Sequence, residues 1–481
     1  MTGGEEKKNI YRTIVKATGL FGGTQVFTIL CSIIKTKLVA IWLGAEGVGI
    51  IGLYNNTVEM ISSLTRLGIG TSSVRDLSKA FKSGDESRFA ELVSVVRRWI
   101  WFTGLLGAVV MLTFAPLLSR YTFGDDTHIW GYVFLSCTLL FTTLTEGERA
   151  VIQASERLRV LARCSVLGSF FAFLPLFYFF GISGIVPAII AHTFSIWVVT
   201  VSLGRKMKVK PVKMSWTETY RQGKNIASLG IYMTVSGFVT TLYSYLFVAW
   251  LNDRGGTGEV GFFQAGYTLV MQYVGLVFTA MSMEYYPRLS AVCEDKVLLS
   301  EHVTRQVETS LLILAPVISL FLIFQNLIIH ILYTPAFLAI SGYISWAVLG
   351  MLFRAFSWSV SFVLLAKGAG RIFLITEIVA DSLMFVMYLV GYTHWGLQGV
   401  GVAYLLAYLF SMTGIYMVCH LKFGLHIPVR MFVSLFVYSS LCYFVWLLWS
   451  NDCLAGAYSL TAFICLFTGF QLKKKIFRKS E

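Results

Sequence analysis

The sequence predicts an all-α integral membrane protein made of two six-helix bundles related by a pseudo-twofold axis, followed by two extra C-terminal helices. Composition, long apolar segments and an internal repeat carry this prediction. Of the 481 residues, 56% are hydrophobic and 13% are charged, and the mean hydropathy is +0.71. Soluble proteins carry about 25% charged residues. The composition therefore excludes a soluble enzyme and a disordered chain.

About fourteen apolar segments are each long enough to cross the hydrocarbon layer as a helix, which satisfies the backbone polar groups internally. Strands are excluded because the hydrophobic residues do not alternate along these long runs. The predicted membrane segments are 18–42, 47–72, 98–119, 127–148, 158–180, 183–203, 226–251, 259–284, 307–332, 340–366, 372–394, 399–420, 429–449 and 456–472.

The placement of Lys and Arg predicts how these segments are oriented. With the N-terminus in the cytoplasm, 33 of the 39 basic residues fall in cytoplasmic tails and loops or at the cytoplasmic ends of segments, 2 fall in outer loops, and 4 lie deeper inside predicted segments. Positive residues mark the cytoplasmic side of a membrane protein, so both termini are expected there. The net charge of +14 is spread over many loops and tails. Because it does not gather in one groove, it argues against nucleic-acid binding.

An internal repeat predicts the domain organisation. Gly181 opens GISGIVPAIIAHTFS, and Gly396 opens GLQGVGVAYLLAYLFS, 215 residues later. With six helices in each copy, the halves share one orientation, so their axis should run along the membrane normal with a cavity between them. The predicted domains are an N-terminal bundle at 1–203, a basic cytoplasmic linker at 204–225, a C-terminal bundle at 226–425, and two extra helices with a basic tail at 426–481.

Motifs for catalysis and cofactors are absent from the sequence. The stretch GVGIIG at Gly47–Gly52 matches GxGxxG formally, but it opens an apolar helix instead of following a strand. Close helix packing is therefore expected there, and not nucleotide binding. Of eight cysteines, only Cys453 falls in a predicted outer loop, which argues against a disulfide framework. No metal, cofactor or enzymatic activity is expected.

Basic residues inside the apolar segments are the candidate substrate-binding residues. Charges in hydrocarbon are costly and usually face an aqueous cavity or a partner. Lys35 and Lys37 lie about 200° apart around one helix, so only one of them can face a given cavity. Arg66 shares a helix face with Glu59, and a structural ion pair with the first predicted helix is the alternative to a binding role. Arg354, in the middle of its segment, is the fourth and strongest candidate.

Acidic residues inside the segments are the candidate ion-coupling residues. Glu377 and Asp381 are four residues apart and share one helix face. Two carboxylates this close should not both ionise readily, so one of them could carry a proton. Asp381 and Arg354 lie at similar distances from the cytoplasmic boundary. Arg354 therefore either forms a buried pair with Asp381 or faces the cavity and meets an anionic substrate. Glu59 is the third candidate for ion coupling, whereas Glu146, near the inner surface, is expected to be mostly solvated.

The stretch KTKLVAIWLGAEGVGIIGLYNN resembles the opening hairpin of the Wzx-type oligosaccharide flippases, the O-antigen and polysaccharide translocases of the MATE-like exporter (MOP) superfamily. GEVGFFQAGYTLVMQYVGLVFTAMSMEYYPRLSAV, from Gly258 to Val292, resembles their seventh to eighth helices. LAKGAGRIFLITEIV and GLQGVGVAYLLAYLF resemble the tenth to twelfth. The resemblance covers about 1–425. Many members have twelve helices, so the segment 429–472 departs from the family pattern.

This resemblance implies a flippase of the bacterial inner membrane. It would move an undecaprenyl-diphosphate-linked oligosaccharide from the cytoplasmic to the outer leaflet by alternating access, driven by H⁺ or Na⁺. Its partners would be membrane lipids, a polysaccharide polymerase and chain-length enzymes. A diphosphate suits a site with Arg or Lys. Two alternatives stay open: an ion-coupled drug or cation antiporter of the same superfamily, and a lipid II flippase.

Overall fold

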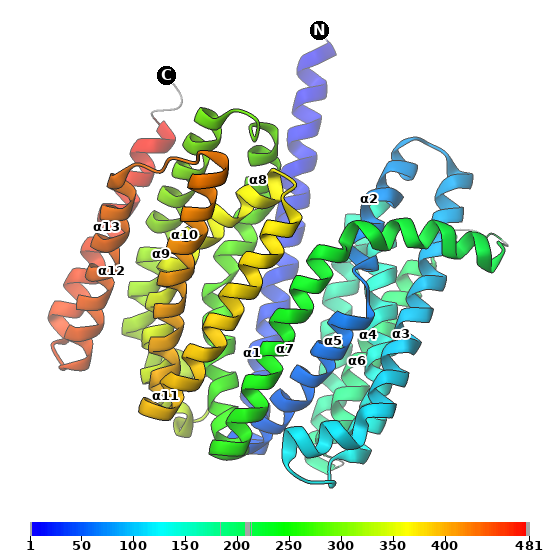
Figure 1. The fold of residues 1–481 in the computed structure, drawn as a ribbon, viewed down its shortest axis with the longest axis horizontal. Helices are drawn as coiled ribbons and strands as arrows, with labels where there is room; N and C mark the ends of the chain where they lie inside the picture. The colour runs from blue at the N-terminus through cyan, green and yellow to red at the C-terminus, as the bar shows by residue number, and fades with distance from the viewer. Residues whose placement is uncertain (1, 183, 207–211, 213, 478–481) are drawn as a thin grey trace. The chain divides into compact units, whose positions relative to one another are not determined.

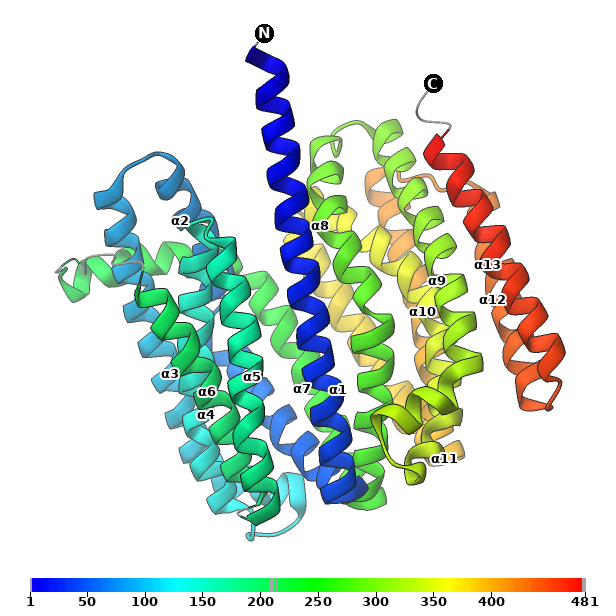
Figure 2. The ribbon, with the colours of Figure 1, turned by 180° about the vertical axis from the view of Figure 1, so that it is seen from behind.

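The computed structural model describes residues 2–182, 184–206, 212 and 214–477, and these ranges contain helices and no strand. Figures 1 and 2 show the helices of the N-terminal part, most of which are long. They are α1 (Thr2–Thr65), α2 (Ile69–Lys82), α3 (Glu86–Phe123), α4 (Ile129–Ala154), α5 (Leu158–Ile182), α6 (Ile185–Arg205) and α7 (Trp216–Thr268).

The C-terminal part continues with helices of the same kind. A six-residue π-helix and a six-residue 3₁₀-helix interrupt the series. The elements are η1 (Leu269–Val274), α8 (Leu276–Ala291), α9 (Lys296–Leu332), η2 (Pro335–Ile340), α10 (Ser341–Ala366), α11 (Gly370–Phe423), α12 (Val429–Ser450) and α13 (Leu454–Phe477).

Three of these helices bend sharply and consist of two arms. The bends lie at Gly44 in α1, at Gly256 in α7 and at Gly396 in α11, where φ is 62°, 75° and 58°. Glycine adopts such positive φ angles without the steric cost that other residues pay. In α1 the arms pack closely, because a Cβ on Gly47 would lie 2.2 Å from the Cβ of Leu43. This agrees with the packing role expected for GVGIIG.

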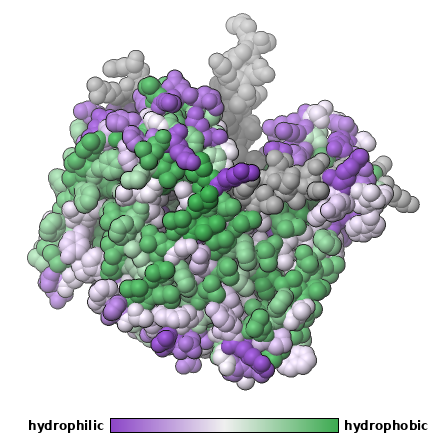
Figure 3. Space-filling view, in the orientation of Figure 1, coloured by the Kyte–Doolittle hydropathy of each residue, from purple (hydrophilic) through white to green (hydrophobic). Residues whose placement is uncertain are grey.

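The predicted all-helical membrane architecture is confirmed. Ten helices of the described chain are long and apolar enough to span a membrane, each bent helix counting once. With the arms of α1, α7 and α11 taken separately, and with α5 included, every predicted membrane segment has a helical counterpart. On the face shown in Figure 3, each part carries a band of apolar side chains between polar ends.

Two predicted loops are largely helical. The prediction ends a membrane segment at residue 72 and leaves 73–98 as a loop, but α1 stops at Thr65 and α2 occupies part of that loop. Helix α2 is amphipathic: Leu77 and Ala80 are buried against Phe89 of α3, and its charged face is exposed. Its low mean hydropathy explains why an apolar-segment criterion misses it. The predicted loop 204–225 likewise already contains the start of α7, at Trp216.

The chain divides by its internal contacts into two compact units, Met1–Gly256 and Thr257–Glu481. In the first unit, α3 packs on α4, α5 on α6, and the first arm of α1 on α5 (Figure 2). In the second unit, α10 packs on α11, and α12 and α13 both pack on α9. The repeat-based bundles 1–203 and 226–425 remain a prediction.

Candidate functional site

Arg354 lies at the centre of the second unit's most buried helix. Helix α10 runs from Ser341 to Ala366, and Arg354 stands near its midpoint, between the buried residues Phe353 and Ala355. The guanidinium is thus more than two helical turns from either end, a depth from which it cannot easily reach the membrane surface. Its side chain is only partly buried.

Aromatic and sulfur-containing side chains surround this guanidinium. Nη1 of Arg354 donates to the hydroxyl oxygen of Tyr404 at 3.3 Å. The guanidinium carbon stands 5.4 Å from the ring centre of Phe278 and 5.6 Å from that of Tyr408. The sulfur atom of Met271, in the π-helix η1, also contacts Nη1. Rings at such distances stabilise a desolvated cation by about 2 kcal/mol, so these neighbours hold the charge without neutralising it.

The two acidic candidates of α11 lie near this arginine but are not its hydrogen-bond partners. Glu377 is within electrostatic range of both Asp381 and Arg354, and Asp381 acts in turn on Tyr267. Among the described residues, the guanidinium donates to Tyr404 and to no carboxylate. The contact with Tyr404 adds to the predicted alternatives, and a direct pair with Asp381 stays a prediction. Asp381 makes its own interactions in the structure.

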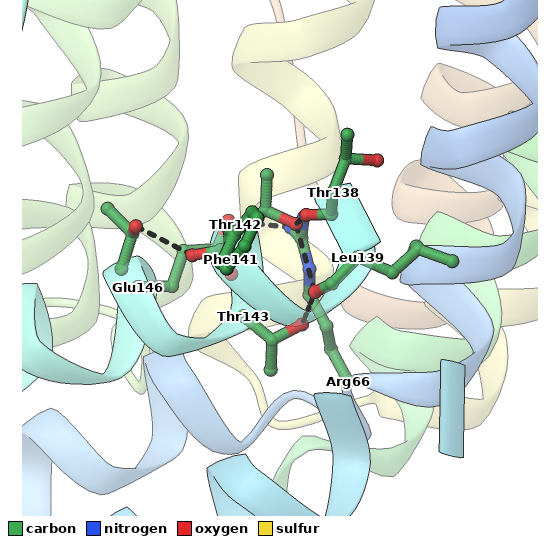
Figure 4. Close-up of polar contacts among 8 residues, drawn as sticks. Arg66, Thr138, Leu139, Phe141, Thr142, Thr143 and Glu146 are labelled. Carbon is green, nitrogen blue, oxygen red and sulfur yellow. Dashed lines mark hydrogen bonds and ion pairs between the residues drawn. The ribbon is translucent and has the colours of Figure 1, made fainter. Parts of the chain in front are cut away.

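Arg66 is placed in an ion pair that the sequence does not predict. Its Nη1 donates to Oε1 of Glu146 on α4 at 2.6 Å, while Glu59 is exposed on α1. The side chains of Arg66 and Glu146 are 20% and 45% exposed. Figure 4 shows Arg66 against a turn of α4 where Thr142 and Thr143 donate back to main-chain carbonyls. The Nε of Arg66 is buried without a hydrogen-bond partner in the described residues.

Lys35 and Lys37 both lie in the first arm of α1 and are partly buried. The charge of Lys35 acts electrostatically on the ring of His192 on α6. Lys37 also takes part in an interaction in the structure. The structure thus distinguishes two basic positions, Lys35 in the first unit and Arg354 in the second, from the ion-paired Arg66.

Sequence reasoning missed the residues that accompany these two cations. Tyr404, Tyr408 and His192 are single polar residues in apolar helices, a pattern that usually means ordinary packing. The internal repeat holds a usable signal, because aligning the common Phe-Ser ends of its two copies places His192 opposite Tyr408. Each of the two rings stands beside an intramembrane cation.

Comparison with known proteins identifies the family and the fold. A family model described as "Polysaccharide biosynthesis protein" matches residues 38–342. No curated protein sequence matches the chain significantly.

Solved structures of similar fold are transporters. An inward-facing multidrug resistance MATE family transporter of the MOP superfamily is 14% identical, with a TM-score of 0.70 over 83% of this chain and 94% of that one. The lipid II flippase MurJ, in an inward closed conformation, is 12% identical, with a TM-score of 0.63 over 96% and 100%. A Vibrio cholerae MATE transporter is 15% identical, with a TM-score of 0.60 over 83% and 95%. The fold of this chain is therefore similar to that of MATE transporters and of MurJ. Since the family match covers more than half of the sequence, the chain belongs to the polysaccharide biosynthesis protein family, as its resemblance to Wzx-type flippases predicted.

Proposed function

We propose that this protein is a flippase that carries a polyprenyl-diphosphate-linked oligosaccharide from the cytoplasmic to the outer leaflet of the bacterial inner membrane. The family assignment supports a role in polysaccharide biosynthesis. The fold supports membrane transport, which in this superfamily fold proceeds by alternating access between two halves. O-antigen is the substrate class that the sequence resemblance favours.

The single observation that carries this proposal is the environment of Arg354. A guanidinium at mid-membrane depth, held by Tyr404 and two aromatic rings, keeps its full positive charge for another anion. A diphosphate can accept two parallel hydrogen bonds from its planar fork. The polyprenyl tail can stay in the lipid while this anionic group crosses. The main free-energy cost of transfer is to move the charged diphosphate through hydrocarbon, and one fixed cation within the protein lowers that cost.

The other basic candidates divide into two groups in this proposal. Lys35 and Lys37 lie in the first unit, so basic residues within predicted membrane segments are not confined to the second unit. Arg66 already pairs with Glu146, so a substrate phosphate would have to compete with that carboxylate. We therefore rank Arg66 below Arg354 and Lys35 as a substrate-binding residue.

The acidic candidates supply a route for ion coupling. Glu377 and Asp381 lie on one arm of α11, close enough to each other and to Arg354 to interact electrostatically. Binding of H⁺ or Na⁺ by this pair would weaken its hold on Arg354 and leave the guanidinium to the substrate. Proton or sodium entry and substrate binding are then reciprocally linked. Glu59, exposed on α1, is a weaker candidate.

The same proposal places the protein in its cellular setting. The excess of Lys and Arg in alternate loops supports cytoplasmic termini. A lipid-linked oligosaccharide on the outer leaflet is the material that a polysaccharide polymerase and a chain-length enzyme use, so these are the proposed partners. Two alternatives come from the fold neighbours: multidrug export and lipid II flipping. The carboxylates of α11 would serve a cation antiporter, and Arg354 argues against one.

A reconstitution experiment separates these functions. Purified protein is placed in liposomes that carry a polyprenyl-diphosphate oligosaccharide, and a lectin added outside measures its arrival in the outer leaflet. Parallel liposomes contain lipid II or a fluorescent cationic drug. We expect flipping of the oligosaccharide lipid, and its loss in Arg354→Ala. Drug transport without lipid flipping would contradict the proposal, and a clear preference for lipid II would reassign the substrate.

A further inference from the structure

A second intramembrane basic site lies wholly within the first unit, where α1, α5 and α6 meet. Val39 of α1 and Ala188 of α6 belong to one buried cluster. Lys35 comes one helical turn before Val39, and His192 comes one turn after Ala188. Because the first arm of α1 and α6 run in opposite directions (Figure 2), both steps lead the same way along the bundle, and the two side chains end up at one level.

The position of His192 decides which of its ring nitrogens can exchange a proton. Nδ1 stands 3.1 Å from the main-chain carbonyl oxygen of Ala172 on α5. A carbonyl oxygen only accepts, so Nδ1 carries a hydrogen in both charge states of the ring. Nε2 is therefore the nitrogen that gains or loses a proton.

The surroundings leave Lys35 as the charge that governs this ring. Lys35 is partly buried, and among the described residues no carboxylate acts on its ammonium group. Helix α5 presents the Ala172 carbonyl to His192. Ala191, next to His192 on α6, lines an apolar groove together with Cys137 and Phe141 of α4. Neither of these two α4 residues carries a charge at neutral pH. Lys35 is the charged group that acts on His192 in this part of the chain.

Because of this arrangement, binding of an anion and protonation of His192 should favour each other. A proton on Nε2 would place a second positive charge beside the Lys35 ammonium, and like charges repel strongly where water is scarce. An anion with two negative charges between them turns the repulsion into attraction and accepts a hydrogen bond from each group. The arginine site in the second unit has no such link, since a guanidinium stays protonated at all relevant pH values.

We propose that Lys35 and His192 form a subsite for a phosphate-type dianion that takes up one proton on Nε2 of His192 when the anion binds. The inference rests on the proposed function in one respect: the natural ligand would be the diphosphate of the lipid-linked substrate. It adds a proton-binding residue outside the α11 carboxylates. The subsite then couples substrate binding to protons within the first unit alone.

Calorimetry of the purified full-length protein tests this subsite directly. The probe is methanedisulfonate, a dianion that carries no titratable proton near neutral pH, so any proton taken up must come to the protein. Titrations in buffers of different ionisation enthalpy give the number of protons absorbed for each anion bound. We expect net proton uptake, and an affinity that rises by up to about tenfold for each unit fall in pH. Binding without proton uptake would overturn the proposal.

Variants assign the proton to its residue. His192→Gln should still bind the probe, more weakly and with an affinity independent of pH. Lys35→Gln should lose about tenfold or more in affinity, the effect of one charge-assisted hydrogen bond, while Lys35→Arg keeps both binding and proton uptake. His394→Gln, at an exposed position beside the bend of α11, is the matched control and should behave as wild type. Proton uptake that persists in a monodisperse His192→Gln would refute the assignment.

The flipping assay separates failure of this subsite from failure of the proposed function. Proton-linked anion binding in a wild-type protein that flips no oligosaccharide lipid would reject the function and keep the subsite. Arg354-dependent flipping by a protein that binds the probe without proton uptake would do the reverse. Expression and gel filtration of each variant identify folding defects, and Lys35→Arg serves where Lys35→Gln does not fold.

Discussion

Arg354 of α10 and Tyr404 of α11 are joined by a hydrogen bond of 3.3 Å from guanidinium to phenol oxygen. The tyrosine ring can approach α10 closely because Gly350, about one turn before Arg354, has no side chain: a Cβ there would stand 2.7 Å from Cδ1 of Tyr404. Tyr404 is itself fully buried. Helix packing thus fixes the phenol, and the phenol in turn orients the cation.

Removing this cation should stop transport without unfolding the protein. Arg354→Ala is expected to lower the flipping rate roughly ten- to a hundredfold, because a hydrogen bond to a charged group contributes about 1.5–3 kcal/mol. Arg354→Lys should keep part of the activity, since the charge survives and the bidentate fork is lost. The liposome assay measures the rate, and membrane immunoblots measure the amount of protein.

The control variant for Arg354 is Arg305→Ala, which removes an exposed arginine of α9 that pairs with Glu301. It should flip at the wild-type rate. Wild-type flipping by Arg354→Ala would show that the site is assigned wrongly. A large fall in protein amount in Arg354→Ala alone would indicate instead that the guanidinium serves the fold.

The carboxylates of α11 should control the dependence on an ion gradient. In inside-out vesicles with an imposed pH gradient, Glu377→Gln and Asp381→Asn are expected to flip at rates that respond weakly to the gradient. The physical reason is that neither variant can exchange a proton at the position that interacts with Arg354. Replacing the proton gradient by a sodium gradient identifies the coupling ion. An unchanged response in both variants would remove these residues from coupling.

The ion pair between Arg66 and Glu146 allows structure and substrate binding to be told apart. The pair is partly exposed, and such pairs stabilise a protein by about 0–1 kcal/mol. Glu146→Gln should therefore lower the thermal midpoint only slightly and leave flipping intact. The exchanged pair, Arg66→Glu with Glu146→Arg, should regain the stability of the wild type but not its flipping rate. Full flipping by the exchanged pair would mean that Arg66 has only a structural role.

The sequence was sufficient for the membrane segments because each is set by its own apolar length. It was insufficient where a partner on another helix decides the outcome. Counting residues places Arg354 and Asp381 at similar depth but does not say which way each side chain turns, and in the structure the guanidinium turns to Tyr404. Arg66 finds Glu146, eighty residues away in the chain, for the same reason. Helix α2 was not predicted because only one of its faces is apolar. That face packs against α3 and not against lipid.

Native cysteines can test the predicted orientation. Cys453 is exposed in the turn between α12 and α13, and Cys293 lies between α8 and α9. In variants that keep only one cysteine, an impermeant maleimide should label Cys453 in cells whose outer barrier is opened. Cys293 should react only after the inner membrane is permeabilised. The reverse pattern would invert the topology and place both termini outside.

The bend of α11 depends on two glycines that let its arms touch. A Cβ on Gly399 would stand 1.9 Å from the carbonyl oxygen of Gly391, whereas a Cβ on Gly414, in the same helix, would meet no atom within 4 Å. Gly399→Ala should therefore force the arms apart and cost about 1–3 kcal/mol, the usual range for overpacking. Gly414→Ala should be neutral or slightly stabilising, because alanine favours the helix. Thermal unfolding in detergent compares the two.

Tyr404 lies on the second arm, so a shifted arm should also weaken its contact with Arg354 and lower flipping in Gly399→Ala. Equal midpoints for both variants would show that the arms can adjust and that the glycine contact is not required.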